Sequence, residues 1–360
     1  MKLLKQITLA LIFASIFFML SCEKTENDLN LAPFADSLSR EEAITEIESC
    51  TNQFSSHTKI IKELKSLKVI NELQDLNSPF ESEEYESEDD EFNFSNYVGT
   101  YTYNFETKKW DKENTPSDKI IFNFPALEHN NTNNSTLTIN NIELNKMGED
   151  EDEMPQKIDL ELKHENKLIM QVNFVLEMPN ESALSIFPKK VELDVVLDDY
   201  TANIAYSLSS ANSIKFKVNY KDEAILDSHI AITVKENLPL PATLNGYIKL
   251  FNLELRPNLK LEELFKSFTE DQEGNNISNM NDKLNEYINL NIGANNNWIS
   301  KLKIATIENS FKRSPIKGND NAYDFYFLFK DNSQEKVSKY LEPLKKDLED
   351  LLDFFEDIIF

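Results

Sequence analysis

The sequence predicts an α+β fold: a large antiparallel meander sheet with one face covered by N- and C-terminal helices. Apolar and polar residues alternate with the period of a strand in many short runs between residues 97 and 330. Helix-period apolar stripes lie before and after this region, at 39–77 and 331–360. Because no helical pattern intervenes between the first ten strand runs, parallel crossovers are excluded and an antiparallel meander is expected.

The N-terminal helix begins at a capping box, in which Ser39 and Glu42 have the spacing for reciprocal hydrogen bonds with the backbone. Neither Pro nor Gly occurs from there to Ser78. Apolar residues recur at helical spacing, namely Ile44, Ile47, Phe54, Ile61, Leu64, Leu67, Leu73 and Leu76. We predict one long helix over 39–77, with any break expected near Ser55 and Ser56.

An acidic segment follows this helix. Residues 81–91 contain eight acidic side chains in eleven positions, and such blocks repel themselves into open conformations. We therefore predict a linker over 78–96.

The strand runs of the sheet body, 97–330, have one apolar and one polar side. In the run 191–198, for example, Val191, Leu193 and Val195 oppose Glu192 and Asp194. Further runs lie at 100–105, 118–124, 135–144, 158–163, 167–177, 202–209, 214–220, 228–235, 244–255, 299–308 and 322–329. This alternation is typical of an antiparallel sheet with one solvated face.

The last third of the chain contains a helical insert near 259–291, indicated by Leu261, Leu264, Phe265 and Phe268 and followed by Asn-rich turns before Trp298. The strand at 322–329 is apolar on both sides, so we predict that it is central and buried. A four-and-three apolar stripe then predicts the C-terminal helix at 331–360; it contains Val337, Leu341, Leu344, Leu348, Leu351, Phe355 and Ile358.

Composition excludes several classes of function. With 37 basic and 63 acidic side chains, the formal charge is −26, which argues against nucleic-acid binding. Two cysteines cannot form a disulfide framework or a cysteine-rich zinc module. Six glycines without a phosphate-loop pattern leave little room for a nucleotide cradle. We expect no cofactor and no metal.

The first residues have the pattern of an export signal. Lys2 and Lys5 precede an uncharged apolar run at 7–20, which is shorter than the roughly 20 residues that span a membrane. Ser21 supplies a small residue directly before Cys22. The sequence therefore predicts a signal peptide over 1–21 and a polar tether over 22–38.

This arrangement resembles the signal and lipobox of bacterial lipoproteins, in the looser form found in Bacteroidota. The resemblance covers residues 1–22 and implies that Cys22 is acylated and anchors the chain in the outer membrane of the cell envelope. The alternative is an ordinary signal peptide with Cys22 an incidental thiol. Asp36-Ser37-Leu38 also resembles the O-glycosylation site of exported Bacteroidota proteins, which implies a glycan on Ser37.

Other candidate residues have structural alternatives. The acidic runs at 81–91 and 149–153, and the segment 271–274, lack the spacing of a Ca²⁺ loop, so we expect solvated loops. The dispersed His57, His129, His164 and His229 are expected at the surface or at helix edges. Cys50 is expected to be a buried, inert thiol; a reactive thiol is the alternative.

Tyr101, Tyr103 and Trp110 form an aromatic group that could contact a glycan or pack across strands. Together these features predict a membrane-anchored, non-enzymatic binding or scaffold module, whose partner is an envelope protein or glycan. One alternative is a carrier of a lipid or other hydrophobic ligand on the apolar face of the sheet. A second is an envelope polysaccharide hydrolase.

Overall fold

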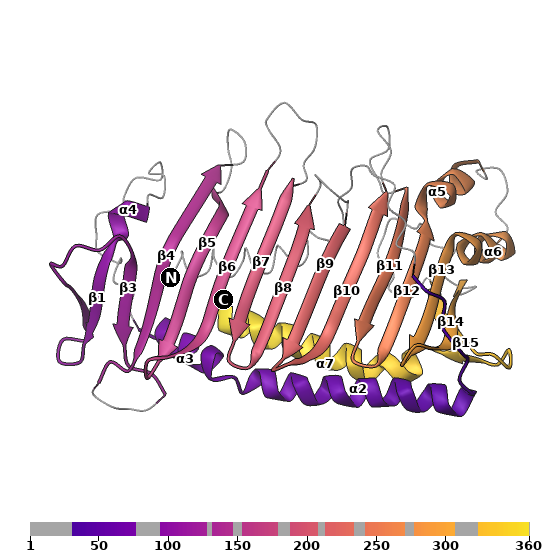
Figure 1. The fold of residues 1–360 in the computed structure, drawn as a ribbon, viewed down its shortest axis with the longest axis horizontal. Coiled ribbons are helices and arrows are strands. Elements are labelled where there is room, and N and C mark those ends of the chain that lie inside the picture. The colour runs from indigo at the N-terminus through magenta and orange to yellow at the C-terminus, as the bar shows by residue number, and fades with distance from the viewer. Residues whose placement is uncertain are drawn as a thin grey trace.

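The computed structural model describes residues 31–76, 94–127, 132–146, 153–178, 188–207, 213–233, 242–270, 277–306 and 323–359. Within them, sixteen strands form a single sheet with helices along one of its faces (Figure 1). The predicted fold class, a mostly antiparallel meander sheet with N- and C-terminal helices, is confirmed.

The strands are β1 Gly99–Asn104, β2 Lys109–Lys112, β3 Ile120–Phe124, β4 Ser135–Lys146, β5 Glu153–His164, β6 Lys167–Glu177, β7 Lys190–Leu197, β8 Tyr200–Ser207, β9 Ser213–Tyr220, β10 Glu223–Thr233, β11 Thr243–Leu250, β12 Leu253–Lys260, β13 Ile288–Ala294, β14 Asn297–Thr306, β15 Tyr323–Leu328 and β16 Gln334–Lys336. The helices are α2 Arg40–Lys62, α3 Lys65–Gln74, α4 Phe94–Tyr97, α5 Leu261–Glu270, α6 Ile277–Tyr287 and α7 Ser338–Ile359.

From β3 to β16 the strands pair in sequence order, each antiparallel to the next. At the other end β1 pairs with β3 in parallel, and β2 forms the edge of the sheet. The prediction that parallel pairs are excluded is therefore wrong at this one place. The hairpin partner β2 and the seven residues after it serve as the crossover, so no helix is needed to return the chain to the far side of β1.

At one end of the strands, many of the connections are tight turns. The two-residue connections β5–β6, β7–β8, β9–β10, β11–β12 and β13–β14 all lie there. Their positive-φ residues are Glu165, Asn166, Asp198, Lys221, Phe251, Asn295 and Asn296, as two-residue hairpins require. The connections at the opposite end of the strands are longer, and one of them contains α5 and α6 (Figure 1).

Helices α2 and α7 lie side by side along the tight-turn edge, behind the sheet in Figure 1. The capping box of α2 is present, with Ser39 and Glu42 bonded in both directions. The N-terminal helix breaks at Glu63 and Leu64, rather than at the two serines. The helix continues through both serines, and the hydroxyl of Ser56 donates to the carbonyl of Asn52 one turn earlier.

Most buried side chains lie on the helix side of the sheet, where they form several clusters, and we call this side the apolar face. Leu160, Phe174 and Leu193 lie on it, and α3 packs against it through Val69 and Leu73. A second cluster joins α2 and α7 to β13–β15, and a third joins the α2–α3 junction to the turns after β7 and β9. The other side of the sheet is the polar face.

Two further strand predictions are wrong, and one strand was missed. β15 is not central, because it lies next to the edge strand β16, and Phe325 is 44% exposed while Phe327 is buried. The run 244–255 is two strands, β11 and β12, because the turn between them begins with an apolar residue, Phe251, in a left-handed conformation. β13 was not predicted; its Ile and Leu residues alternate with Asn, which resembled a turn-rich segment.

Candidate functional site

The chain segment 31–38, predicted to belong to a loose tether, is fixed at the start of β14. The amide of Trp298 donates to the carbonyl of Asp36 at 2.5 Å, and the amide of Leu38 donates to the carbonyl of Trp298 at 2.9 Å. β15 pairs with β14 only from Lys301 onward. The segment therefore occupies the length of β14 that β15 leaves open, and it satisfies backbone groups there.

Phe34 holds this segment on the polar face. Its ring lies over Gly293, where a Cβ atom would be 2.2 Å from the ring. The guanidinium of Arg256 lies 3.7 Å from the ring centroid, a cation–π contact. The same guanidinium donates to the carbonyl of Ala32 and, through Nε, to Glu254 at 2.5 Å. The absent side chain of Gly293 is thus what lets the segment dock.

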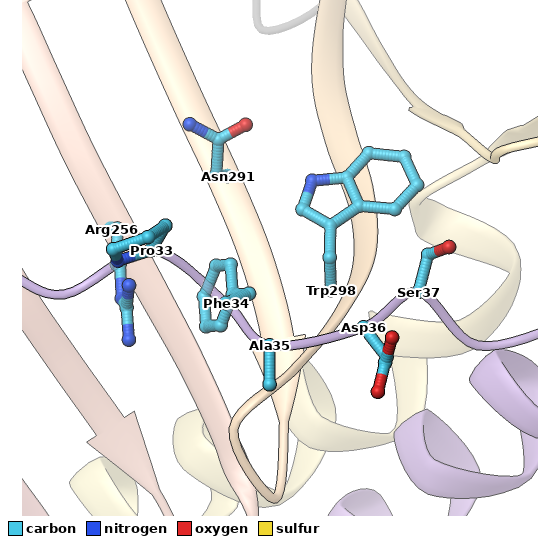
Figure 2. Close-up of a pocket in the computed structure, with 8 residues that line it drawn as sticks. All are labelled: Pro33, Phe34, Ala35, Asp36, Ser37, Arg256, Asn291 and Trp298. Carbon is cyan, nitrogen blue, oxygen red and sulfur yellow. The ribbon is translucent and has the colours of Figure 1, made fainter.

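A pocket of about 560 Å³ lies between this segment and the sheet (Figure 2). Its lining residues are Pro33, Phe34, Ala35, Asp36, Ser37, Arg256, Asn291 and Trp298. In the sheet register Asn291 lies directly between Arg256 on β12 and Lys301 on β14. An amide flanked by two cations, beside a half-buried indole, suits a small anionic or polar group.

Charge is unevenly distributed over the polar face. Of the described side chains that β9–β16 direct to it, eight are basic and three acidic; we call this region the basic half. The basic residues are Lys215, Lys217, Lys249, Arg256, Lys260, Lys301, Lys303 and Lys336, and the acidic ones are Asp227, Glu254 and Asp324. For a chain of net charge −26 this excess is unexpected.

The part of the polar face formed by β4–β8, the acidic half, has the opposite balance. Its described side chains include Lys157, Lys163 and Lys190 against Glu143, Asp159, Glu161, Glu177, Glu192 and Asp194. Each of these three lysines forms an ion pair with a glutamate on the same face. In the basic half, by contrast, no described carboxylate lies within 4.0 Å of six lysines, which are Lys215, Lys217, Lys249, Lys260, Lys301 and Lys303.

Of the residues singled out from the sequence, Ser37 lies at the pocket, half-buried, in a parallel bridge with Trp298. Cys22 lies outside the described residues, as do the acidic run 81–91 and the segment 271–274. Of the run 149–153, only the backbone of Glu153 is described. The roles predicted for Cys22 and Ser37 stay predictions.

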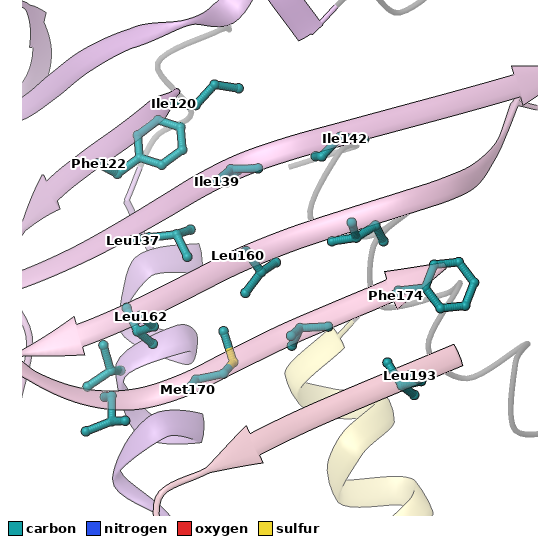
Figure 3. Close-up of a cluster of buried hydrophobic side chains, with 14 of the residues drawn as sticks. Ile120, Phe122, Leu137, Ile139, Ile142, Leu160, Leu162, Met170, Phe174 and Leu193 are labelled. Atoms are coloured by element: carbon teal, nitrogen blue, oxygen red, sulfur yellow. The ribbon is translucent and has the colours of Figure 1, made fainter. Parts of the chain in front are cut away.

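Tyr101, Tyr103 and Trp110 lie together on the apolar face, near Phe122 in the cluster of Figure 3. Tyr103 and Trp110 have ring centroids 5.5 Å apart, and Trp110 lies at the same distance from Phe122. Tyr101 is buried. These contacts are cross-strand aromatic packing, and any glycan contact would be restricted to the exposed parts of Tyr103 and Trp110.

The described histidines differ in their surroundings. His164, expected near the surface, is only 3% exposed, and its Nδ1 lies 2.8 Å from the hydroxyl of Ser135. Sequence reasoning missed this pair because the two residues meet only through the register of β4 and β5. Since Ser135 is 1% exposed, a substrate could not reach its hydroxyl, and the pair links the strands.

His57 is half-buried in an aromatic group, with its Nδ1 2.8 Å from the hydroxyl of Tyr200 and its ring stacked near Phe251. Burial lowers the pKa of His57 and, together with Lys215, that of His229. His129 lies outside the described residues.

Cys50 is a buried thiol, as predicted. Cys50 is buried, its Sγ lies 3.5 Å from the carbonyl of Leu250, and burial raises the pKa of the thiol to about 12. A thiol with this pKa is inert at neutral pH.

Within the described ranges, no three His, Cys, Asp or Glu side chains are arranged to hold a metal ion. No helix in this part of the chain is long and apolar enough to cross a membrane. No protein-family model matches the chain, and the searches of curated proteins and of solved structures gave no significant match.

Proposed function

We propose that this protein is a bacterial envelope lipoprotein, anchored in the outer membrane through an acylated Cys22, that acts as a non-enzymatic binding module. The apolar run at 7–20 followed by Ser21 and Cys22 supports the anchor. The observation that carries the binding role is the docking of 31–38 on the polar face, beside a pocket whose lining contains a guanidinium, a carboxylate, an amide and aromatic rings.

Docking of this segment shortens the tether. Nine peptide links separate Cys22 from Leu31, and they can span at most about 32 Å. A random coil of this length would reach roughly 15–18 Å. An anchor at Cys22 would therefore keep the pocket end of the polar face close to the membrane.

The two alternative functions have less support from the described residues. A hydrophobic carrier would use the apolar face, but Leu160 and Phe174 there are already buried, so the face would have to open. For a hydrolase, the one buried Ser–His pair of Ser135 and His164 is closed to substrates.

Detergent phase partition of the exported protein tests the anchor. The wild type should enter the detergent phase and incorporate labelled fatty acid, because two or more acyl chains bind a bilayer stably. Cys22→Ala should remain in the aqueous phase. Cys50→Ala is the matched control and should behave as wild type. Partition of Cys22→Ala into detergent, or a native N-terminal peptide without acyl chains, would contradict the proposal.

A further inference from the structure

We propose that the basic half of the polar face binds the anionic headgroup layer of the membrane. This inference rests on the proposed anchoring, since it names the surface against which the anchored module lies. Two independent observations support it: the excess of unpaired lysines on this half, and the docking of the segment that leads to Cys22 on the same half.

The charges of the molecule favour one orientation. The chain as a whole is strongly acidic, so an anionic surface repels most of it. Among the described strand faces, the basic half has the attractive charge, and six of its lysines have no described carboxylate within 4.0 Å. The acidic half would repel phosphates, and its lysines are already paired. Attraction and repulsion therefore both favour an orientation in which the basic half of the polar face lies toward the membrane.

The shape of the sheet suits this contact. Eight adjacent strands, β9–β16, cover about 38 Å at the usual strand spacing, and Figure 1 shows β9–β15 side by side in one layer. Lys215 and Lys217 on β9 lie on the same side of that layer as Lys301 and Lys303 on β14. Charges spread over one face can approach a planar surface together to within the Debye length of roughly 8 Å.

The pocket would receive a single headgroup. Arg256 already bonds to Glu254 and Ala32, so Asn291 in the pocket lining would donate hydrogen bonds to phosphate oxygens. Lys301, its neighbour in the sheet register, would add a positive charge beside the pocket. Trp298 adds an indole at the same place (Figure 2), and indoles are favoured at the level of lipid headgroups. The carboxylate of Asp36, on the pocket rim, opposes this binding and would favour headgroups that also carry a cation.

The test uses the mature chain, 22–360, with Cys22→Ser so that no acyl chain contributes. Its binding is measured on vesicles of phosphatidylcholine and on vesicles that also contain phosphatidylglycerol. We expect binding only to the anionic vesicles, and loss of binding when salt is raised. Equal binding to both vesicles would overturn the proposal.

Two matched variants locate the surface. The triple variant Lys215→Gln/Lys217→Gln/Lys249→Gln removes three lysines of the basic half that have no ion pair. Each lysine removed should lower the partition coefficient about fivefold. Lys157→Gln/Lys163→Gln/Lys190→Gln removes three paired lysines of the acidic half and should change binding little. Equal losses in the two variants would contradict the assignment. Retention on a soluble anionic polysaccharide without vesicle binding would instead assign the face to a glycan.

The acylated protein separates this inference from the anchoring proposal. Trp110 and Trp298 are the two tryptophans, so Trp110→Phe leaves Trp298 as the only indole fluorophore. Quenching of Trp298 by lipids brominated near the headgroup is expected. A protein that enters the membrane fraction with Trp298 unquenched would refute the orientation and leave the anchor standing. Charge-dependent binding of the Cys22→Ser chain, with no acylation of the native protein, would refute the anchor alone.

Discussion

Helix α3 is capped by a residue far along the chain. Its own N-cap residue, Leu64, makes no side-chain cap bond. Instead, Asp198, in the turn between β7 and β8, accepts hydrogen bonds through Oδ2 from the amide of Ser66 at 2.9 Å and from its hydroxyl at 2.8 Å. Ser66 is fully buried. Removing the carboxylate should therefore leave two buried donors without a partner.

The magnitude depends on the replacement. Asp198 has a φ of +50°, which Gly tolerates. Asp198→Gly therefore tests the cap without adding strain at this residue, and should lower the free energy of unfolding by about 2–4 kcal/mol. Asp198→Ala adds a left-handed Ala, which costs a further ~1 kcal/mol. Asp198→Asn keeps an acceptor and tolerates this φ, so its loss should be below about 1.5 kcal/mol.

Urea unfolding monitored by fluorescence gives the free energy of unfolding of each of the three Asp198 variants. The comparison requires that the dependence of this free energy on urea concentration is the same in all of them. Hydrogen exchange of the Ser66 amide should accelerate in Asp198→Gly and much less in Asp198→Asn. If Asp198→Gly were as stable as the wild type, or if Gly and Asn had equal effects, the cap would not be what stabilises α3.

Two other predictions concern the docked segment and the half-buried imidazole of His57. Gly293→Ala places a Cβ 2.2 Å from Phe34, so segment 31–38 should detach; exchange of the Leu38 amide should then accelerate, and unchanged protection would contradict the docking. Burial lowers the pKa of His57 below its ordinary value of 6.5, so the unfolded chain binds more protons and stability should fall as pH drops through and below 6.5. His57→Gln should reduce this slope in urea unfolding, and an unchanged slope would contradict the assignment.

The alternation of apolar and polar residues was enough to predict the sheet, because a strand with one buried face imposes a period of two on its own sequence. The start of α2 was equally local, since Ser39 and Glu42 satisfy each other within one turn. Strand β13 was missed because its polar positions are filled by Asn, a residue that also favours turns.

The candidate site was only partly visible in the sequence. Ser37 and Trp298 were noticed, but nothing local indicated that they pair, or that Phe34 fits over Gly293. Lys215 and Lys217 alternate with apolar residues along one strand. Their neighbours on other strands could not be assigned until the register was known.

The sequence by itself determined most of the elements of this protein: the runs that form the majority of the strands, the apolar side of those strands, and the regions of the first and last helices. Tertiary structure alone decided the parallel pairing of β1 with β3, the cap that Asp198 provides for α3, and the gathering of lysines on one half of the polar face. The reason is physical. Periodicity reflects the environment of each residue along its own element, whereas these features depend on contacts between distant residues, which only the packed sheet brings together.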